Sequence, residues 1–442
     1  MDFRTFSRLT TLVFILCETG GMLLAQDRQD EATPANNAAR RLNEDGLIPV
    51  DGAIASVQKR LSTAPESASL QRLLGQLYMR RAKEQGDHLA YQKAEQTFRK
   101  VLKNYPKDSK ASTYLATALQ AQHQFKEALK IASDVAKESP KNTLAQATIG
   151  DCQLELGRYD AAEESFATLA KMTNGPSVQA RLARLAELKG DTEQATELLT
   201  EALRDVQDAG GLGSLESWFE WRLGSIAFDT GRLKRASRHF RNAIAIDSSN
   251  AQAVVGLAKV QAAQGQHGEA IAAYFGAIED FGEPPMMAAL GDVYRRLGDE
   301  EEAMHWYEQA EEAMAEEAVH AAAAHYREVA MFYADRDLKP QRALELAKKD
   351  FALRQDVYGH DMLAWTLYRN GKFEEAAKSI EQALRLGTRD AKMFFHAGMI
   401  YNALGQSKRA QKAFETAIEI NPHFSLLHSE TAKEELAKLA PH

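Results

Sequence analysis

The chain has 442 residues, of which 45% are hydrophobic, so it has the composition of a folded protein but is too long for one ordinary hydrophobic core. Two or three domains, or an array of repeats, are expected instead. The formal charge of −8 provides no electrostatic attraction for a nucleic acid or an anionic membrane, so neither is expected as a partner.

The first 25 residues have the three-part layout of a secretory signal peptide. Arg4 and Arg8 form a basic start, an apolar run follows from Leu9 to Cys17, and Ala25 is a small residue before a polar stretch. The apolar run is far shorter than the roughly 20 residues that a membrane span needs. We therefore expect this segment to direct export and to be removed near Ala25.

The alternative for the same segment is an uncleaved membrane anchor formed by residues 9–25. Glu18 argues against it, because a carboxylate is costly in lipid. Residues 26–46 are polar and are expected to form a flexible linker. If the first segment is removed, Cys152 is the only cysteine left, so an internal disulfide is impossible.

From residue 68 to residue 422 one pattern returns, in most cases every 33 or 34 residues. An alanine marks each unit: Ala94, Ala128, Ala162, Ala195, Ala236, Ala270, Ala303, Ala343, Ala376 and Ala410. The intervals from Ala195 to Ala236 and from Ala303 to Ala343 are longer, which we attribute to extended loops or helices. Self-similarity of this kind indicates stacked repeats, because one unit cannot bury its apolar face alone. Residues 47–66 are expected to add a partial repeat.

Three positions keep a constant offset from the marker alanine, as the last unit illustrates. Gly398 is the small residue that lets two helices approach closely, and Phe414 is the large residue that fills the gap between them. Gly405 lies between them, where glycine can end the first helix in the left-handed conformation. The pairs of glycine and aromatic ring recur as Gly150 and Phe166, Gly224 and Phe240, and Gly291 and Tyr307. Each unit is therefore predicted to be a hairpin of two helices.

This pattern resembles the tetratricopeptide repeat, most closely in "FFHAGMIYNALGQSKRAQKAFETAIEINP" (residues 394–422). The resemblance implies an all-α fold, a right-handed α-solenoid of about nine to ten helix–turn–helix units, with the repeat array over residues 68–422. Residues 423–442 are expected to form a C-terminal capping helix and tail, which such arrays need at an open end.

In this family the inward-facing side chains of the first helices line a groove that binds a partner. Aromatic side chains beside charged or amide groups suit such a surface, because they combine large contact area with few rotamers. The alternative for each aromatic residue is packing against a neighbouring helix. The predicted groove residues are Trp221, Phe228, Asp361, Trp365, Tyr368, Arg369, Phe395 and Asn402.

Motifs for catalysis, phosphate binding or structural zinc are not found in the sequence. His325 and Glu328 lie one helical turn apart, but a metal site would need at least one more ligand. We therefore expect no catalytic residue, no metal and no cofactor.

The resemblance implies a non-catalytic scaffold that holds a segment of another protein or peptide in its groove. It also favours a bacterial setting, with the protein periplasmic, in the cell envelope or secreted. The alternative location is attachment to the inner membrane by residues 9–25, which would be the chain's one membrane span. Two other functions stay open, namely a structural protein that self-assembles and an enzyme without a recognisable motif.

Overall fold

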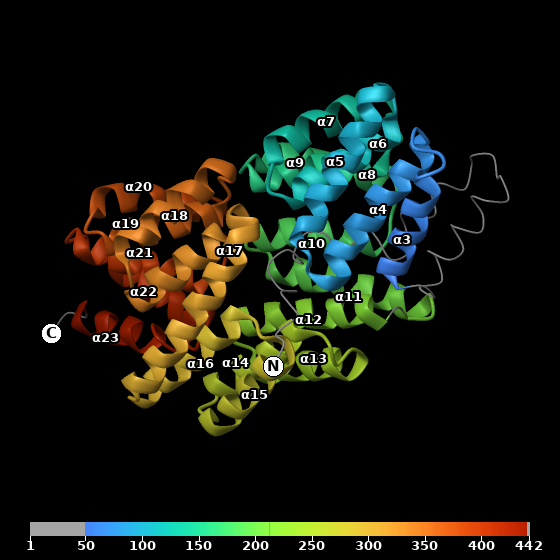
Figure 1. Ribbon diagram of the computed structural model, residues 1–442. Coiled ribbons are helices and arrows are strands. Elements are labelled where there is room, and N and C mark those ends of the chain that lie inside the picture. Colours follow the sequence, from blue (N-terminus) through green and yellow to red (C-terminus); the bar gives the residue numbers. More distant parts are fainter. Residues whose placement is uncertain (1–48, 212, 440–442) are drawn as a thin grey trace. The chain divides into compact units, whose positions relative to one another are not determined.

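The computed structural model describes residues 49–211 and 213–439, with the side chains of 317–324 excepted. This part of the chain contains α-helices and one short 3-10 helix, and no strand (Figure 1). The predicted signal segment and linker, residues 1–46, lie outside the described residues. None of the helices in the described ranges combines the length and the apolar character that crossing a membrane requires.

The chain divides into two compact units. Unit 1 comprises the described residues up to Leu154 together with Tyr159–Thr173, and unit 2 comprises Glu155–Arg158 and the described residues from Asn174 onward. The helices of unit 1 are α3 (Val50–Leu61), α4 (Ala68–Gln85), α5 (His88–Asn104), α6 (Ser109–Ala121), α7 (Phe125–Glu138), α8 (Thr143–Glu155, whose last residue belongs to unit 2) and α9 (Tyr159–Met172).

Unit 2 continues the series of helices. Its members are α10 (Pro176–Leu188), α11 (Thr192–Asp208), α12 (Gly213–Asp229), α13 (Leu233–Ile246), α14 (Ala251–Ala263), α15 (His267–Phe281), α16 (Pro284–Leu297), α17 (Glu300–Arg336), α18 (Pro340–Leu353), α19 (Val357–Arg369), α20 (Phe373–Ala383), η2 (Leu384–Leu386), α21 (Ala391–Ala403), α22 (Ser407–Ile420) and α23 (Ser429–Leu439). Consecutive helices pack against each other from α3 to α7 in unit 1 and from α10 to α23 in unit 2. Helices α8 and α9 of unit 1 meet at Gly150 and Phe166. Each unit is therefore a stack of helical hairpins. The predicted all-α fold of stacked helix–turn–helix units is confirmed.

The predicted pairing of a glycine with an aromatic ring is what closes the hairpins. A Cβ atom at Gly398 would lie 2.4 Å from the ring of Phe414, so only a hydrogen fits between the two helices. The corresponding distance is 2.3 Å from Gly150 to Phe166, 2.7 Å from Gly224 to Phe240 and 2.5 Å from Gly291 to Tyr307. The constant sequence offset therefore marks one recurring contact.

The first complete hairpin departs from that offset. Its contact joins Gly75 to Phe98, where an added Cβ would lie 2.5 Å from the ring. Helix α4 continues to Gln85 before the turn, which places the glycine about two helical turns further from its ring in sequence than in the other hairpins. The constant offset could not reveal this pair, because it assumes helices of equal length.

The long interval between Ala303 and Ala343 results from one long helix, α17, which ends at Arg336 before α18 begins. Helix α17 has 37 residues and serves as the second helix of one hairpin and the first helix of the next. Its sequence contains no glycine or proline and is rich in alanine and glutamate, so nothing ends the helix where other units turn. Asp299 caps its start by accepting a hydrogen bond from the Glu302 amide at 3.2 Å.

Unit 2 also makes contacts between hairpins that are remote in sequence. The Thr388 hydroxyl donates a hydrogen bond to the Leu188 carbonyl, 200 residues earlier. Nδ2 of Asn421 donates to the Phe228 carbonyl at 2.8 Å. The turn at Gly190 has a φ of +80°, and a Cβ there would lie 2.3 Å from the Gly387 carbonyl oxygen. Turns of early hairpins thus touch connections between late hairpins.

The glycine contact predicts opposite effects for two Gly→Ala substitutions in unit 2. Gly398→Ala should destabilise the protein by about 1–3 kcal/mol, because the new methyl group overlaps the Phe414 ring. Gly276→Ala, in helix α15 with no atom within 4 Å of the added Cβ, should stabilise it by about 0.5–1 kcal/mol. Urea unfolding followed by circular dichroism measures both. Equal stability of the two variants would contradict this account.

Candidate partner-binding site

The first helices of the hairpins in unit 2 form one face, which we call the first-helix face. Neighbouring first helices pack together along it, as α12 does with α14 and α19 with α21. Charged side chains occupy this face: Arg184, Glu187, Arg222, Asp229, Lys259, Asp292, Asp335, Arg336, Asp361 and Lys392. Most of the groove residues predicted from the sequence are aromatic, and of these charged residues only Asp361 was among them. The position of Asp229 directly after the predicted groove residue Phe228 could have pointed to it.

Ion pairs between different first helices hold several of these charges in place. Glu187 pairs with Arg222 at 2.6 Å, and Asp292 pairs with Arg336 at 2.7 Å. Lys392 donates a hydrogen bond to Asp335. Because each pair joins two hairpins, these charges help to align neighbouring repeats and also make the face polar.

Asp229 and Lys259 differ from the other charges. Both side chains are exposed, and neither forms a hydrogen bond or an ion pair within the described part of the chain. Their tips are open to water, yet the surrounding helices displace much of the bulk solvent. This burial, together with the carboxylates of Asp390 and Glu187, raises the pKa of Asp229 to about 7, and burial also lowers the pKa of Lys259.

Four of the predicted groove residues lie together in one aromatic cluster. The Trp365 ring stacks on the Tyr368 ring at 4.9 Å and on the His396 ring at 4.2 Å, with the Arg369 guanidinium 4.5 Å from its centre. Phe395 meets Trp365 edge-on at 5.7 Å. Trp365 and Phe395 are each only 1% exposed, whereas Tyr368 and Arg369 are partly exposed.

The other predicted groove residues take part in separate contacts. Asp361 is buried and lies 2.8 Å from Nδ1 of His396. Nδ2 of Asn402 donates a hydrogen bond to Glu435 at 2.9 Å. Trp221 and Phe228 are partly buried against the core between α12, α13 and α14. Contact of any of these residues with a partner stays a prediction.

The chain's own end covers the aromatic cluster. We call residues 423–439 the C-terminal segment; it comprises a short connection and helix α23. The Phe424 ring lies 5.6 Å from the Phe395 ring, and the His428 ring stacks on Phe395 at 4.9 Å and meets Trp365 at 5.9 Å. The two most deeply buried aromatic residues of the predicted groove therefore contact this segment in the structure.

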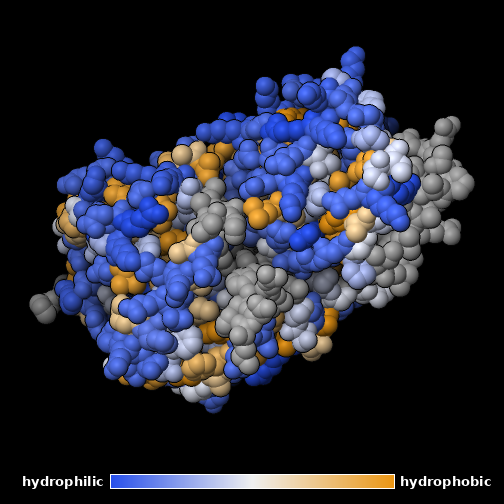
Figure 2. Space-filling view, viewed as in Figure 1, coloured by the Kyte–Doolittle hydropathy of each residue, from blue (hydrophilic) through white to orange (hydrophobic). Residues whose placement is uncertain are grey.

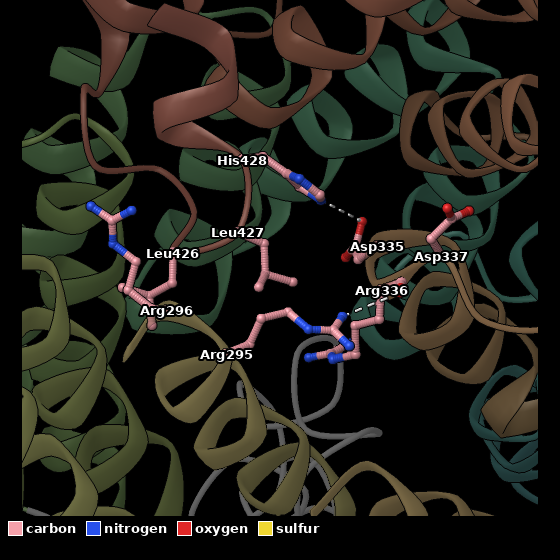
Figure 3. Close-up of a pocket in the computed structure, with 8 residues that line it drawn as sticks. All are labelled: Arg295, Arg296, Asp335, Arg336, Asp337, Leu426, Leu427 and His428. Atoms are coloured by element: carbon pink, nitrogen blue, oxygen red, sulfur yellow. Dashed lines mark hydrogen bonds and ion pairs between the residues drawn. The ribbon is translucent and has the colours of Figure 1, made fainter. Parts of the chain in front are cut away.

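A cavity of about 300 Å³ lies beside this cluster (Figure 3). It is lined by Arg295, Arg296, Asp335, Arg336, Asp337, Leu426, Leu427 and His428. His428 points toward Asp335, but its Nε2 is 3.9 Å from Oδ1 of Asp335, too far for a hydrogen bond. Both atoms are buried and have no hydrogen-bond partner in the described structure. No signal in the repeat pattern could have marked His428, because it follows the last repeat.

Burial controls the charge of this histidine. It lowers the pKa of His428 to about 3; Asp335 acts in the opposite direction, and Lys392, His396 and Arg369 lower the pKa further. Asp335 keeps its charge, because Lys392 and the two histidines outweigh its burial and lower its pKa to about 2. At neutral pH the structure thus holds an uncharged imidazole against an ionised carboxylate.

The described residues offer little to a metal ion. No three His, Cys, Asp or Glu side chains within them lie close enough together to hold one. Nδ1 of His325 is 3.6 Å from Glu328, so this pair forms a local contact. Cys152 is buried and is not in a disulfide.

Comparison with known proteins identifies the repeats. Models of the tetratricopeptide repeat match residues 88–147, 119–185, 227–290, 284–313 and 362–423, together more than half of the chain. The chain belongs to the tetratricopeptide repeat (TPR) family. It is 30% identical to tetratricopeptide repeat protein 1 of Schizosaccharomyces pombe over 143 residues, which are 30% of this chain and only 14% of that protein.

Several solved TPR-like structures are similar at low identity. Yeast Tom70 is 13% identical with a TM-score of 0.35, and the match covers 84% of this chain and 95% of that chain. A tetratricopeptide repeat protein from Parabacteroides merdae is 20% identical with a TM-score of 0.33, covering 60% and 98%. The APC/C hetero-tetramer Cut9–Hcn1 is 15% identical with a TM-score of 0.35, covering 99% and 100%.

The buried neutral histidine predicts that acid loosens the C-terminal segment of this TPR protein. His428 has a lower pKa when the segment is docked than the ordinary 6.5 that it regains on release. Docking is therefore fully stable above pH 6.5 and weakens as the pH falls from 6.5 toward 3. Between pH 7 and pH 5 the opening equilibrium should increase roughly 25-fold.

Amide hydrogen exchange of residues 429–439, corrected for the intrinsic rate at each pH, measures this opening. The exchange of His428→Phe, which cannot be protonated there, should show no such increase. A protection that is independent of pH in the unmodified chain would refute the expectation.

Proposed function

We propose that this TPR protein is a non-catalytic scaffold that binds a segment of another protein on the first-helix face of unit 2. TPR repeats support a role in protein interaction. The choice of face rests on the exposed residues Asp229 and Lys259, which form no hydrogen bond and no ion pair within the described chain. Elsewhere on this face the acidic and basic side chains largely neutralise one another.

Asp229 and Lys259 lie on α12 and α14, two first helices that pack together. A carboxylate accepts hydrogen bonds and an ammonium group donates them, so the two suit a polypeptide, which supplies both N–H and C=O groups. The side of the molecule drawn in Figure 2 is largely hydrophilic, with hydrophobic side chains in small separate groups.

Removing both charges should weaken partner binding without unfolding the chain. In the double variant Asp229→Asn, Lys259→Met, we expect the amount of co-purified partner from the native cell to fall about tenfold or more, because hydrogen bonds to charged groups are lost. Glu374→Gln is the matched control, since Glu374 is exposed on α20, a second helix. Mass spectrometry of both preparations identifies and quantifies the partner. Unchanged capture by a folded double variant would reject this face.

We also propose that residues 1–25 direct export, so that the scaffold works in the periplasm or envelope or is secreted. The support is the basic, apolar and small-residue layout of this segment. N-terminal sequencing of the protein purified from its native cell should find a start close to Gln26. An intact Met1 in the cytosolic fraction would contradict export, and an intact Met1 in the membrane fraction would support the inner-membrane anchor.

A further inference from the structure

The C-terminal segment is attached to the repeat array by a connection that can act as a hinge. Asn421, just after α22, is buried and anchored by its hydrogen bond to the Phe228 carbonyl. Beyond it, the hydrogen bonds of the connection are internal. The Ser425 amide donates to the Ser429 hydroxyl at 3.0 Å, and the Leu427 amide donates to the Ser425 hydroxyl at 3.3 Å. The segment can therefore leave as a folded piece while the array stays anchored at Asn421.

Helix α23 packs against α22, but little of it is fully buried. Within this helix only Ser429 and Ala432 are buried. Its polar links to other helices are the Asn402–Glu435 hydrogen bond and the Arg296–Glu430 ion pair, which is 4.0 Å long with both side chains nearly half exposed. Exposed pairs of this kind contribute little to stability. Phe424 and His428 add aromatic contacts with Phe395 and Trp365 to this packing.

The segment also fits its site imperfectly. An open pocket of about 300 Å³ lies between Leu426, Leu427 and His428 of the segment and the charged side chains of α16 and α17. Nε2 of His428 and Oδ1 of Asp335 are both buried without a hydrogen bond. Unsatisfied buried polar atoms lower the stability of a docked piece. A different occupant that fills the cavity and bonds to Asp335 would bind better than the chain's own segment.

We infer that the C-terminal segment is a displaceable internal occupant of a partner-binding surface formed by Trp365, Tyr368, Phe395, Arg296 and Asn402. The partner that replaces it is a protein segment with matching chemistry, namely an aromatic anchor followed by acidic residues. This chemistry is taken from the contacts of the segment itself. Phe424 packs on the aromatic cluster, Glu430 pairs with Arg296, and Glu435 accepts a hydrogen bond from Asn402. This inference rests on the proposed function as a scaffold, and extends it with a second surface and with the kind of partner that this surface binds.

The test uses the full chain and a fluorescein-labelled synthetic peptide with the sequence of residues 421–439. In the variant Phe424→Ala the internal segment loses its main anchor, so the surface is open more often. Fluorescence anisotropy should show the peptide binding to this variant about tenfold or more tightly than to the unmodified chain. Lys438→Ala is the matched control on the same segment, because Lys438 is 68% exposed, and it should bind like the unmodified chain.

Two altered peptides test the chemistry of the partner. A peptide with Phe424→Ala and a peptide with Glu430→Gln and Glu435→Gln should both bind the opened variant several-fold more weakly. Equal binding of the unaltered peptide to all three chains would overturn the inference. Equal binding of all peptides to the opened variant would overturn the stated partner chemistry.

A second measurement tests the inference on the unmodified chain, so it can be made even if Phe424→Ala does not fold. In the unmodified chain, amides of residues 429–439 should exchange at least about tenfold faster than those of α21 and α22, because the segment opens without the array. Exchange at one common rate would overturn displacement. The Asp229 and Lys259 variants report on the scaffold function separately, so a failure of that function and a failure of the displaceable segment give different results.

Discussion

The close approach of two helices at a glycine is the contact on which the rest of this protein depends. Only a hydrogen fits between Gly398 and the ring of Phe414, and the same contact recurs in hairpin after hairpin. The Phe240 ring also lies against Gly256 of the following helix, where an added Cβ would be 2.6 Å away. One ring therefore closes its own hairpin and joins it to the next. Because such contacts link only neighbours, stability is distributed along the array.

This packing places the first helices of unit 2 side by side and gives them a shared face. Ion pairs such as Glu187 with Arg222 cross from one first helix to another. Helix α17 continues the array without a turn, so one helix belongs to two hairpins and bears Asp335 near its end. Charges that are far apart in the sequence thus pair across neighbouring first helices. Asp229 and Lys259 form no hydrogen bond and no ion pair within the described part of the chain.

The end of the chain introduces a competition for part of this surface. His428 and Phe424 cover aromatic residues that the repeat pattern marks for a partner. The cover is imperfect, because an open pocket lies beside it and two buried polar atoms, Nε2 of His428 and Oδ1 of Asp335, have no hydrogen-bond partner in the described structure. A neutral buried imidazole adds sensitivity to acid, since protonation favours the released segment. Access to the aromatic cluster would thereby depend on both the partner and the pH.

The sequence by itself determined the hairpin, the glycine–aromatic contact and the neighbourhood of Trp365, Tyr368 and Phe395. These features follow from short spacings in the sequence, because residues three or four apart in a helix lie on the same side of it. Only the tertiary structure decided that α17 is one helix, that the Thr388 hydroxyl meets the Leu188 carbonyl, and that His428 lies on Phe395. The physical reason is that these features do not follow the repeat period. The two long-range contacts join residues far apart in the sequence, so they form only when whole hairpins stack in a particular way.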